Sequence, residues 1–163
     1  MEGAAVGSKE GSAELYLCRE NLLSSLSREW IAVAQKSDRL AGFEWNKSVV
    51  VPVTTLDALI GKHGQPRFIK IDVEGFELEV LGGLTQAPPA MSFEFNSEYA
   101  QQAELCLQQE CIKANSSFNL RMESDMSFLF ERWVTIEELR AHLRSEELKA
   151  QSTWGDIFVK SKE

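Results

Sequence analysis

Long apolar runs are missing from this sequence of 163 residues, and so is an excess of positive charge. No uninterrupted apolar stretch approaches the roughly 20 residues that a membrane-spanning helix needs. The formal net charge of −8 argues against a nucleic-acid-binding protein, which needs a basic face, and against adhesion to anionic lipid. A neutral or cationic small molecule remains compatible with this charge.

Cysteine and histidine are also scarce. Cys18, Cys106 and Cys111 include no paired-thiol motif, and no secretory signal is visible. We therefore expect free thiols in a reducing, cytoplasmic compartment. His63 and His142 are isolated, and no set of ligands has zinc spacing, so the sequence predicts no metal site.

The chain length corresponds to one domain, and 44 % hydrophobic residues with four tryptophans are enough for a core. The first half predicts an irregular stretch over 1–12, strands near 14–18, 48–53, 68–73 and 91–95, and short helices between them. Residues 97–163 predict a helix over 98–112, a strand at 118–122, a helix through 143 with a capping box, and a last strand at 155–160. We expect a single α/β domain over 1–163, with a mainly parallel sheet and its core motif in 48–96.

The clearest unit runs from strand to helix to strand. Apolar residues nearly fill Phe68–Val73, which predicts a strand buried on both faces of the sheet. In the helix that follows, the apolar positions share one face, while Glu77 and Glu79 point elsewhere. Gly82 and Gly83 end this helix. The spacing to the next strand indicates a right-handed crossover between parallel strands.

Two carboxylates follow the first strand of this unit. Asp72 and Glu74 are two residues apart, and Gly75 lets the backbone turn tightly into the helix. In an open α/β sheet such groups lie in the crevice at the carboxyl ends of the strands. They could accept hydrogen bonds from a hydroxyl or a cationic group, or act as a general base. The alternative is that both are solvated residues that cap the helix.

Three further polar residues lie on or beside the same strands. Lys70, inside an apolar strand, could pair with Asp72 or Glu74, or could extend to solvent at an edge. Glu94 is framed by phenylalanines and followed by Asn96 at the end of the neighbouring strand. A glutamate in that setting is costly to bury without a partner, so it is either a positioned site residue or half of a structural salt bridge.

Three blocks of this sequence resemble the FkbM family of methyltransferases. The run Phe68-Ile-Lys-Ile-Asp-Val-Glu-Gly-Phe-Glu-Leu-Glu-Val-Leu-Gly-Gly-Leu84 is similar to the family's central motif almost residue for residue. Val53-Thr-Thr-Leu-Asp-Ala-Leu59 looks like the short segment that precedes that motif. Residues 4–17 resemble the loop and strand that follow the third strand of the family's sheet.

The resemblance implies a Rossmann-like fold and transfer of a methyl group from S-adenosylmethionine to a small-molecule acceptor, usually a hydroxyl of a sugar or natural product. On this basis Asp72, Glu74 and Lys70 would be catalytic, and Asp72 and Gly75 would lie at the cofactor. Glu94 and Asn96 would bind the acceptor. The segments 21–45 and 115–133 are the expected variable acceptor loops.

The family's first two strands, which carry the cofactor loop and the ribose carboxylate, have no match in this sequence. We therefore expect an N-terminally truncated sheet, the C-terminal part of the domain, and impaired cofactor binding by this chain alone. An alternative is a non-catalytic module that binds a partner through an exposed sheet edge, either a second copy or the missing N-terminal segment.

Overall fold

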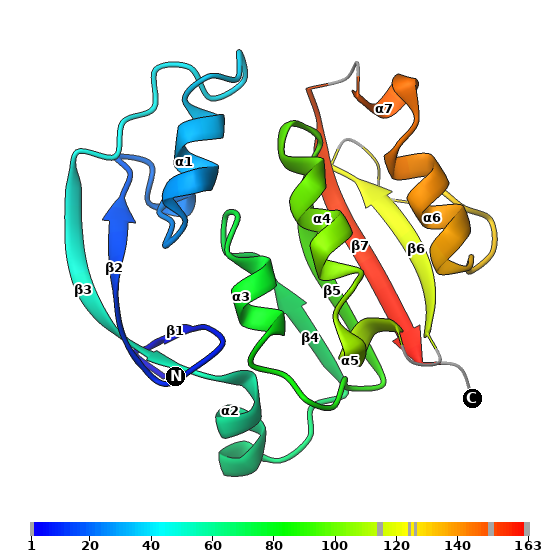
Figure 1. The fold of residues 1–163 in the computed structure, drawn as a ribbon, viewed down its shortest axis with the longest axis horizontal. Helices are drawn as coiled ribbons and strands as arrows, with labels where there is room; N and C mark the ends of the chain where they lie inside the picture. The colour runs from blue at the N-terminus through cyan, green and yellow to red at the C-terminus, as the bar shows by residue number, and fades with distance from the viewer. Residues whose placement is uncertain (1, 114–115, 124, 126, 150–151, 162–163) are drawn as a thin grey trace.

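Two β-sheets organise the protein in the computed structural model, which describes residues 2–113, 116–123, 125, 127–149 and 152–161. The first sheet has the order β1-β3-β2 and the second has the order β4-β5-β7-β6. The strands are β1 (Ala5–Val6), β2 (Gly11–Leu17), β3 (Lys47–Thr54), β4 (Phe68–Ile71), β5 (Ala90–Asn96), β6 (Ser116–Met122) and β7 (Trp154–Ser161). Figure 1 shows the smaller sheet beside the larger one, with the helices between and around them.

Strand direction in the larger sheet differs from the prediction. β4 and β5 are parallel, which confirms the strand–helix–strand crossover. β7, however, lies between β5 and β6 and is antiparallel to both. In the smaller sheet β1 is parallel to β3, whereas β2 is antiparallel to it. The α/β class is confirmed, but the mainly parallel sheet is wrong, because the last strand returns along the sheet and inserts between two strands that point the same way.

The helices are short. They are η1 (Asn21–Leu23), α1 (Arg28–Ala34), α2 (Leu56–His63), α3 (Glu77–Leu81), η2 (Ser97–Tyr99), α4 (Ala100–Cys106), α5 (Glu110–Lys113), α6 (Ile136–Leu143) and α7 (Glu146–Lys149). The predicted capping box is present at α6, where Thr135 and Glu138 satisfy each other's backbone N–H groups. The expected single helix over 98–112 is divided into η2, α4 and α5. It breaks after α4 because the N–H groups of Gln108 and Gln109 bond to carbonyls three residues back.

The main core lies on one face of the larger sheet. Phe93 and Phe95 of β5, Phe118 of β6 and Ile157 of β7 are buried there. Helices α3 and α4 lie over this face (Figure 1). Burial of each such side chain contributes about 1.5–3 kcal/mol of transfer free energy. A second, smaller apolar cluster gathers around Trp30 of α1 and connects the first sheet to the rest of the molecule.

Strand β4 is an edge strand, contrary to the prediction of burial on both faces. Its one strand partner among the described residues is β5. Phe68 keeps 47 % of its surface exposed, and Lys70 is exposed as well. Apolar content alone cannot separate an edge strand from a central one. The irregular stretch expected over 1–12 also holds only in part, because Ala5–Val6 pairs with Val53–Thr54 and β2 already begins at Gly11.

The turn between β4 and α3 has an unusual backbone. Glu74 has a φ of 53° and is the one non-glycine residue with positive φ among those described, and Gly75 follows with a φ of 83°. A side chain at Gly75 would have its Cβ 2.3 Å from Cβ and Cγ of Trp30. Glycine is therefore required at position 75 for two separate reasons, its backbone conformation and the close approach of the indole.

Gly75→Ala is expected to destabilise the protein by about 3 kcal/mol or more, because a left-handed residue costs about 1–2 kcal/mol and overpacking adds about 1–3 kcal/mol. Urea unfolding measures the loss. The matched control is Gly42→Ala, since Gly42 has a φ of 97° but nothing within 4 Å of a Cβ. This control should lose only the backbone cost of about 1–2 kcal/mol. Equal losses for the two variants would contradict the packing of Trp30 on the turn.

Candidate active site

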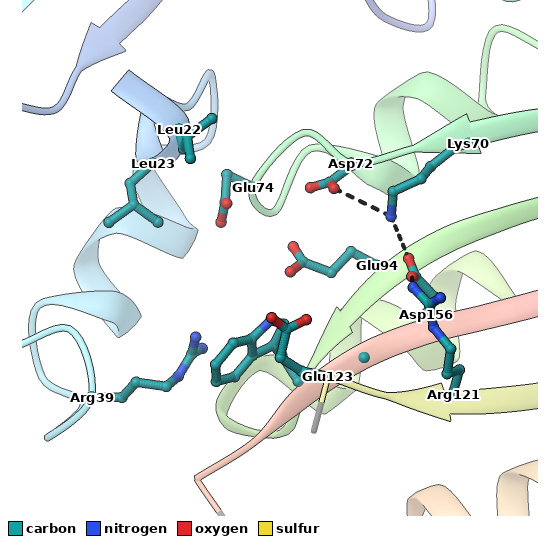
Figure 2. Close-up of a pocket in the computed structure, with 12 residues that line it drawn as sticks. Leu22, Leu23, Arg39, Lys70, Asp72, Glu74, Glu94, Arg121, Glu123 and Asp156 are labelled. Carbon is teal, nitrogen blue, oxygen red and sulfur yellow. Dashed lines mark hydrogen bonds and ion pairs between the residues drawn. The ribbon is translucent and has the colours of Figure 1, made fainter. Parts of the chain in front are cut away.

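A cavity of about 580 Å³ opens at the carboxyl ends of β4, β5 and β6. β7 begins at the same end, because it runs in the opposite direction. Figure 2 shows acidic and basic side chains entering the cavity from the sheet, with two leucines of η1 across from them. Its lining residues are Leu22, Leu23, Arg39, Lys70, Asp72, Glu74, Glu94, Arg121, Glu123, Trp154, Gly155 and Asp156.

Three carboxylates converge in this cavity. One oxygen from each of Asp72, Glu74 and Glu94 lies within 4.8 Å of the others. Burial, followed by the charge of Asp72, raises the pKa of Glu74 to about 7. Burial, followed by the charge of Glu74, raises the pKa of Glu94 to about 9. The neutral form of Glu94 therefore predominates near pH 7, and its carboxyl group can donate a hydrogen bond.

Such a set of oxygens suits a cationic group or the hydroxyls of a ligand. The sequence predicts no metal site because the three residues are not arranged in a ligand motif. They meet only through the fold, since two follow β4 and the third lies on β5. The sequence-based expectation of no metal site stays a prediction.

Lys70 bridges two carboxylates at one side of the cavity. Its Nζ lies 2.6 Å from Asp156 and 3.2 Å from Asp72. Arg121 contacts the other oxygen of Asp156 at 2.9 Å (Figure 2). Although burial lowers the pKa of Lys70, its hydrogen bond to Asp156 gives a net increase. The sequence left two alternatives for Lys70, an ion pair or an exposed position at the sheet edge. The structure shows both, because Lys70 lies on an edge strand and also pairs with Asp72.

The opposite side of the cavity is held by Arg39. Its guanidinium stacks 4.3 Å from the ring centroid of Trp154 and donates to Oδ1 of Asn96 at 2.6 Å. A longer contact of 3.4 Å joins it to Glu98. Because Arg39 comes from the irregular segment after α1, these contacts fasten that segment to the ends of β5 and β7. Glu94 lacks an ion pair in the described part of the chain, so the salt-bridge alternative for this residue is not realised.

Neither Asp72 nor Glu74 caps α3, which lacks a side-chain hydrogen bond at its N-cap. Other side chains hold the turn instead. Ser25 donates to the Glu74 carbonyl at 2.6 Å, and Gln102 donates to the Gly75 carbonyl at 3.1 Å. Glu77, which the helical pattern placed away from the core, is only 3 % exposed and accepts backbone N–H groups of the turn. The prediction for Glu77 is wrong, because this residue precedes the buried Val80 and Leu81 by three and four residues and therefore shares their face of the helix.

Sequence reasoning placed four residues that line the cavity, namely Asp72, Glu74, Lys70 and Glu94. Gly75 belongs to the turn but does not line the cavity, and Asn96 contacts the lining residues Arg39, at 2.6 Å, and Glu94, at 3.5 Å. The residues missed are Leu22, Leu23, Arg39, Arg121, Glu123, Trp154, Gly155 and Asp156. An acidic residue in an otherwise apolar last strand was the one available signal, for Asp156. Both expected acceptor segments, 21–45 and 115–133, contribute to the lining.

The chain belongs to the family defined by the methyltransferase FkbM domain, whose model matches residues 2–146. Membership indicates a methyltransferase and therefore a methyl donor. No curated protein and no solved structure matches the chain. Among the described residues, no helix has the length and apolar character needed to cross a membrane.

Glu94 should make stability fall with rising pH. The folded state retains a proton that the unfolded chain releases near the ordinary glutamate pKa of 4.5, so this stability is lost as pH rises from there toward about 9. The glutamine of Glu94→Gln cannot ionise, so the variant should stabilise the protein more at about pH 8.5 than at about pH 5.5. With an allowance for solvent screening, the two stabilising effects should differ by about 1–3 kcal/mol. Urea unfolding at both pH values measures this difference.

The control is Glu137→Gln, a substitution of an exposed glutamate on α6. Its effect on the free energy of unfolding should be small and similar at the two pH values. If Glu94→Gln also changes the free energy of unfolding equally at the two pH values, Glu94 is ionised in the folded protein. The assignment of a neutral carboxyl is then wrong.

Proposed function

We propose that this protein transfers a methyl group from S-adenosylmethionine to a hydroxyl group of a small acceptor such as a sugar or natural product. The family membership supports methyl transfer. The observation that carries the proposal is the acidic cavity at the carboxyl ends of β4 and β5, which is built around the motif of the family. Its volume of about 580 Å³ lies within the range of small-molecule sites.

The donor set of the cavity fits the proposed cofactor. When bound, S-adenosylmethionine supplies an electrophilic methyl group on a positively charged sulfur. The carboxylate of Asp72 offers negative charge for a cation, and the positive charge of Lys70 is shared between Asp72 and Asp156. Asp72 is the group that we expect to hold the cofactor. Gly75 was also expected there, but its N–H and carbonyl are engaged by Glu77 and Gln102, so its part is to shape the turn.

The acceptor side of the site is assigned to Glu74, Glu94 and Asn96. Glu74, with a pKa of about 7, is half ionised near neutral pH and suits a general base that takes the proton of the acceptor hydroxyl. Glu94 can donate or accept a hydrogen bond, which suits the orientation of a polyol. Asn96 acts through Arg39, whose guanidinium it fixes against Trp154. Correct alignment of the acceptor oxygen can lower the activation free energy of methyl transfer by several kcal/mol.

Glu74→Gln should lower methyl transfer about 10²–10⁴-fold, because the acceptor proton then has no base, and should leave the affinity for S-adenosylmethionine within about threefold. Calorimetric titration with S-adenosylmethionine and incubation of the methyl-labelled compound with monosaccharides and phenols measure the two quantities. The wild-type rate should rise with pH through about 7. Asp72→Asn should greatly reduce the rate of methyl transfer while changing the free energy of unfolding only slightly.

Glu137→Gln is again the control and should change neither quantity. Failure of the wild-type protein to bind S-adenosylmethionine, both alone and together with a segment that supplies the family's first two strands, would refute the proposal. If Glu74→Gln transfers methyl groups at the wild-type rate, Glu74 is not the general base, but the rest of the proposal stands. If Asp72→Asn loses activity and stability to the same extent, Asp72 is a structural residue.

A second candidate function is partner binding through the free edge of β4, in place of catalysis. The observation that favours it is Phe68, an aromatic residue that is 47 % exposed on that edge. If the edge mediates self-association, sedimentation should show a dimer, and Phe68→Lys should shift the protein to a monomer. A monomer in the wild-type protein at all concentrations would contradict self-association through this edge.

A further inference from the structure

The carboxylate of Glu77 is buried, although a carboxylate is costly to remove from water. Glu77 begins α3 and is 3 % exposed. None of the ion pairs of the described residues involves it. Burial raises the pKa of this carboxyl to about 7, against the opposing effect of its backbone hydrogen bonds. An acidic group in this position needs other partners that account for its burial.

The hydrogen bonds of Glu77 identify these partners. Its Oε1 accepts the N–H of Val73 at 3.2 Å and the N–H of Gly75 at 3.3 Å. These two N–H groups flank Glu74, and both point inward from a tight turn in which backbone partners are not available. A buried N–H group without an acceptor costs about 1–3 kcal/mol, so one carboxylate oxygen removes two such penalties.

The same bonds determine where two cavity carboxylates point. Glu74 has a φ of 53°, a conformation that a non-glycine residue adopts at a cost of about 1–2 kcal/mol. The bonds from Val73 and Gly75 fix the backbone on both sides of Glu74, and the bond from Ser25 fixes its carbonyl, so Glu77 helps to keep the residue in this conformation. Asp72 directly precedes Val73, so its direction depends on the same contact.

We propose that Glu77 is a positioning residue, whose buried carboxylate holds the turn 72–75 so that Asp72 and Glu74 face the cavity. The assignment rests on the proposed function for the meaning of the cavity, but the geometry of the turn can be tested without any ligand. Glu77 itself does not line the cavity, so it acts through the turn and not on the reacting atoms.

Two variants separate the acceptor from the charge. Glu77→Gln keeps a carbonyl oxygen that can accept both N–H groups, whereas Glu77→Met keeps similar volume without an acceptor. The matched control is Glu79→Met on the same helix, since Glu79 is also partly buried and one of its carboxylate oxygens has no hydrogen-bond partner. Three measurements apply: amide hydrogen exchange at Val73 and Gly75, the amide–Hα coupling of Glu74, which reports φ, and calorimetric titration with S-adenosylmethionine.

Glu77→Met should accelerate exchange at both amides at least about tenfold, change the coupling of Glu74, and weaken cofactor binding at least about tenfold. It should also lower the thermal midpoint, because the N–H groups of Val73 and Gly75 lose their acceptor. Glu77→Gln should stay within about threefold of the wild-type protein in exchange and binding, and Glu79→Met should match the wild type. A role limited to stability would instead lower the midpoint of both Glu77 variants without this difference between them.

The inference is overturned if Glu77→Met leaves the exchange and the coupling unchanged, if Glu77→Gln behaves like Glu77→Met, or if the turn is released and cofactor affinity is retained. If the wild-type protein binds no S-adenosylmethionine in the tests of the proposed function, that function is wrong, but the inference about Glu77 is not yet contradicted. In that case the exchange and coupling data, which need no ligand, still decide whether Glu77 holds the turn.

Discussion

The contact of the Trp30 indole with the backbone at Gly75 is the constraint on which the rest of the structure depends. It allows α1 and the smaller sheet to pack against the turn that carries Asp72 and Glu74, because no side chain separates the two. The hydrogen bond from Ser25 to the Glu74 carbonyl adds a polar contact from the same segment. The carboxylates therefore hold their positions only while the two sheets stay together, and the site belongs to the interface between them.

Charge in the cavity is distributed unevenly. Lys70 and Arg121 are both engaged by Asp156, which leaves Glu74 and Glu94 without an ion pair among the described residues. The result is a fixed network at one side of the cavity and two titratable carboxyls at the other. A group whose pKa lies near neutrality can exchange protons readily, whereas a group locked in an ion pair mainly fixes geometry. The same few residues thus provide both a rigid wall and a proton acceptor.

The sequence predicts local features well and long-range ones poorly. The motif from Phe68 to Leu84 predicts the crossover and the acidic turn because both depend on neighbouring residues, and the capping box at α6 is likewise local. The direction of β7 and the edge position of β4 depend on where distant strands insert. Glu77 was placed on the wrong face because its charge argued against burial, although its spacing of three, four and seven residues from Val80, Leu81 and Leu84 puts it on their face of the helix. Arg39 reaches the cavity from an irregular segment, and no local pattern marks its destination.

Lys70 has a consequence that extends beyond the site. It is an exposed lysine in the four-residue strand β4, next to the aromatic surface of Phe68. Short edge strands that carry lysine resist uncontrolled pairing with strands of other molecules. The same ammonium group that orders Asp72 and Asp156 therefore also guards against aggregation. A replacement at position 70 that preserved the cavity but removed the positive charge would leave this edge open to pairing with another strand.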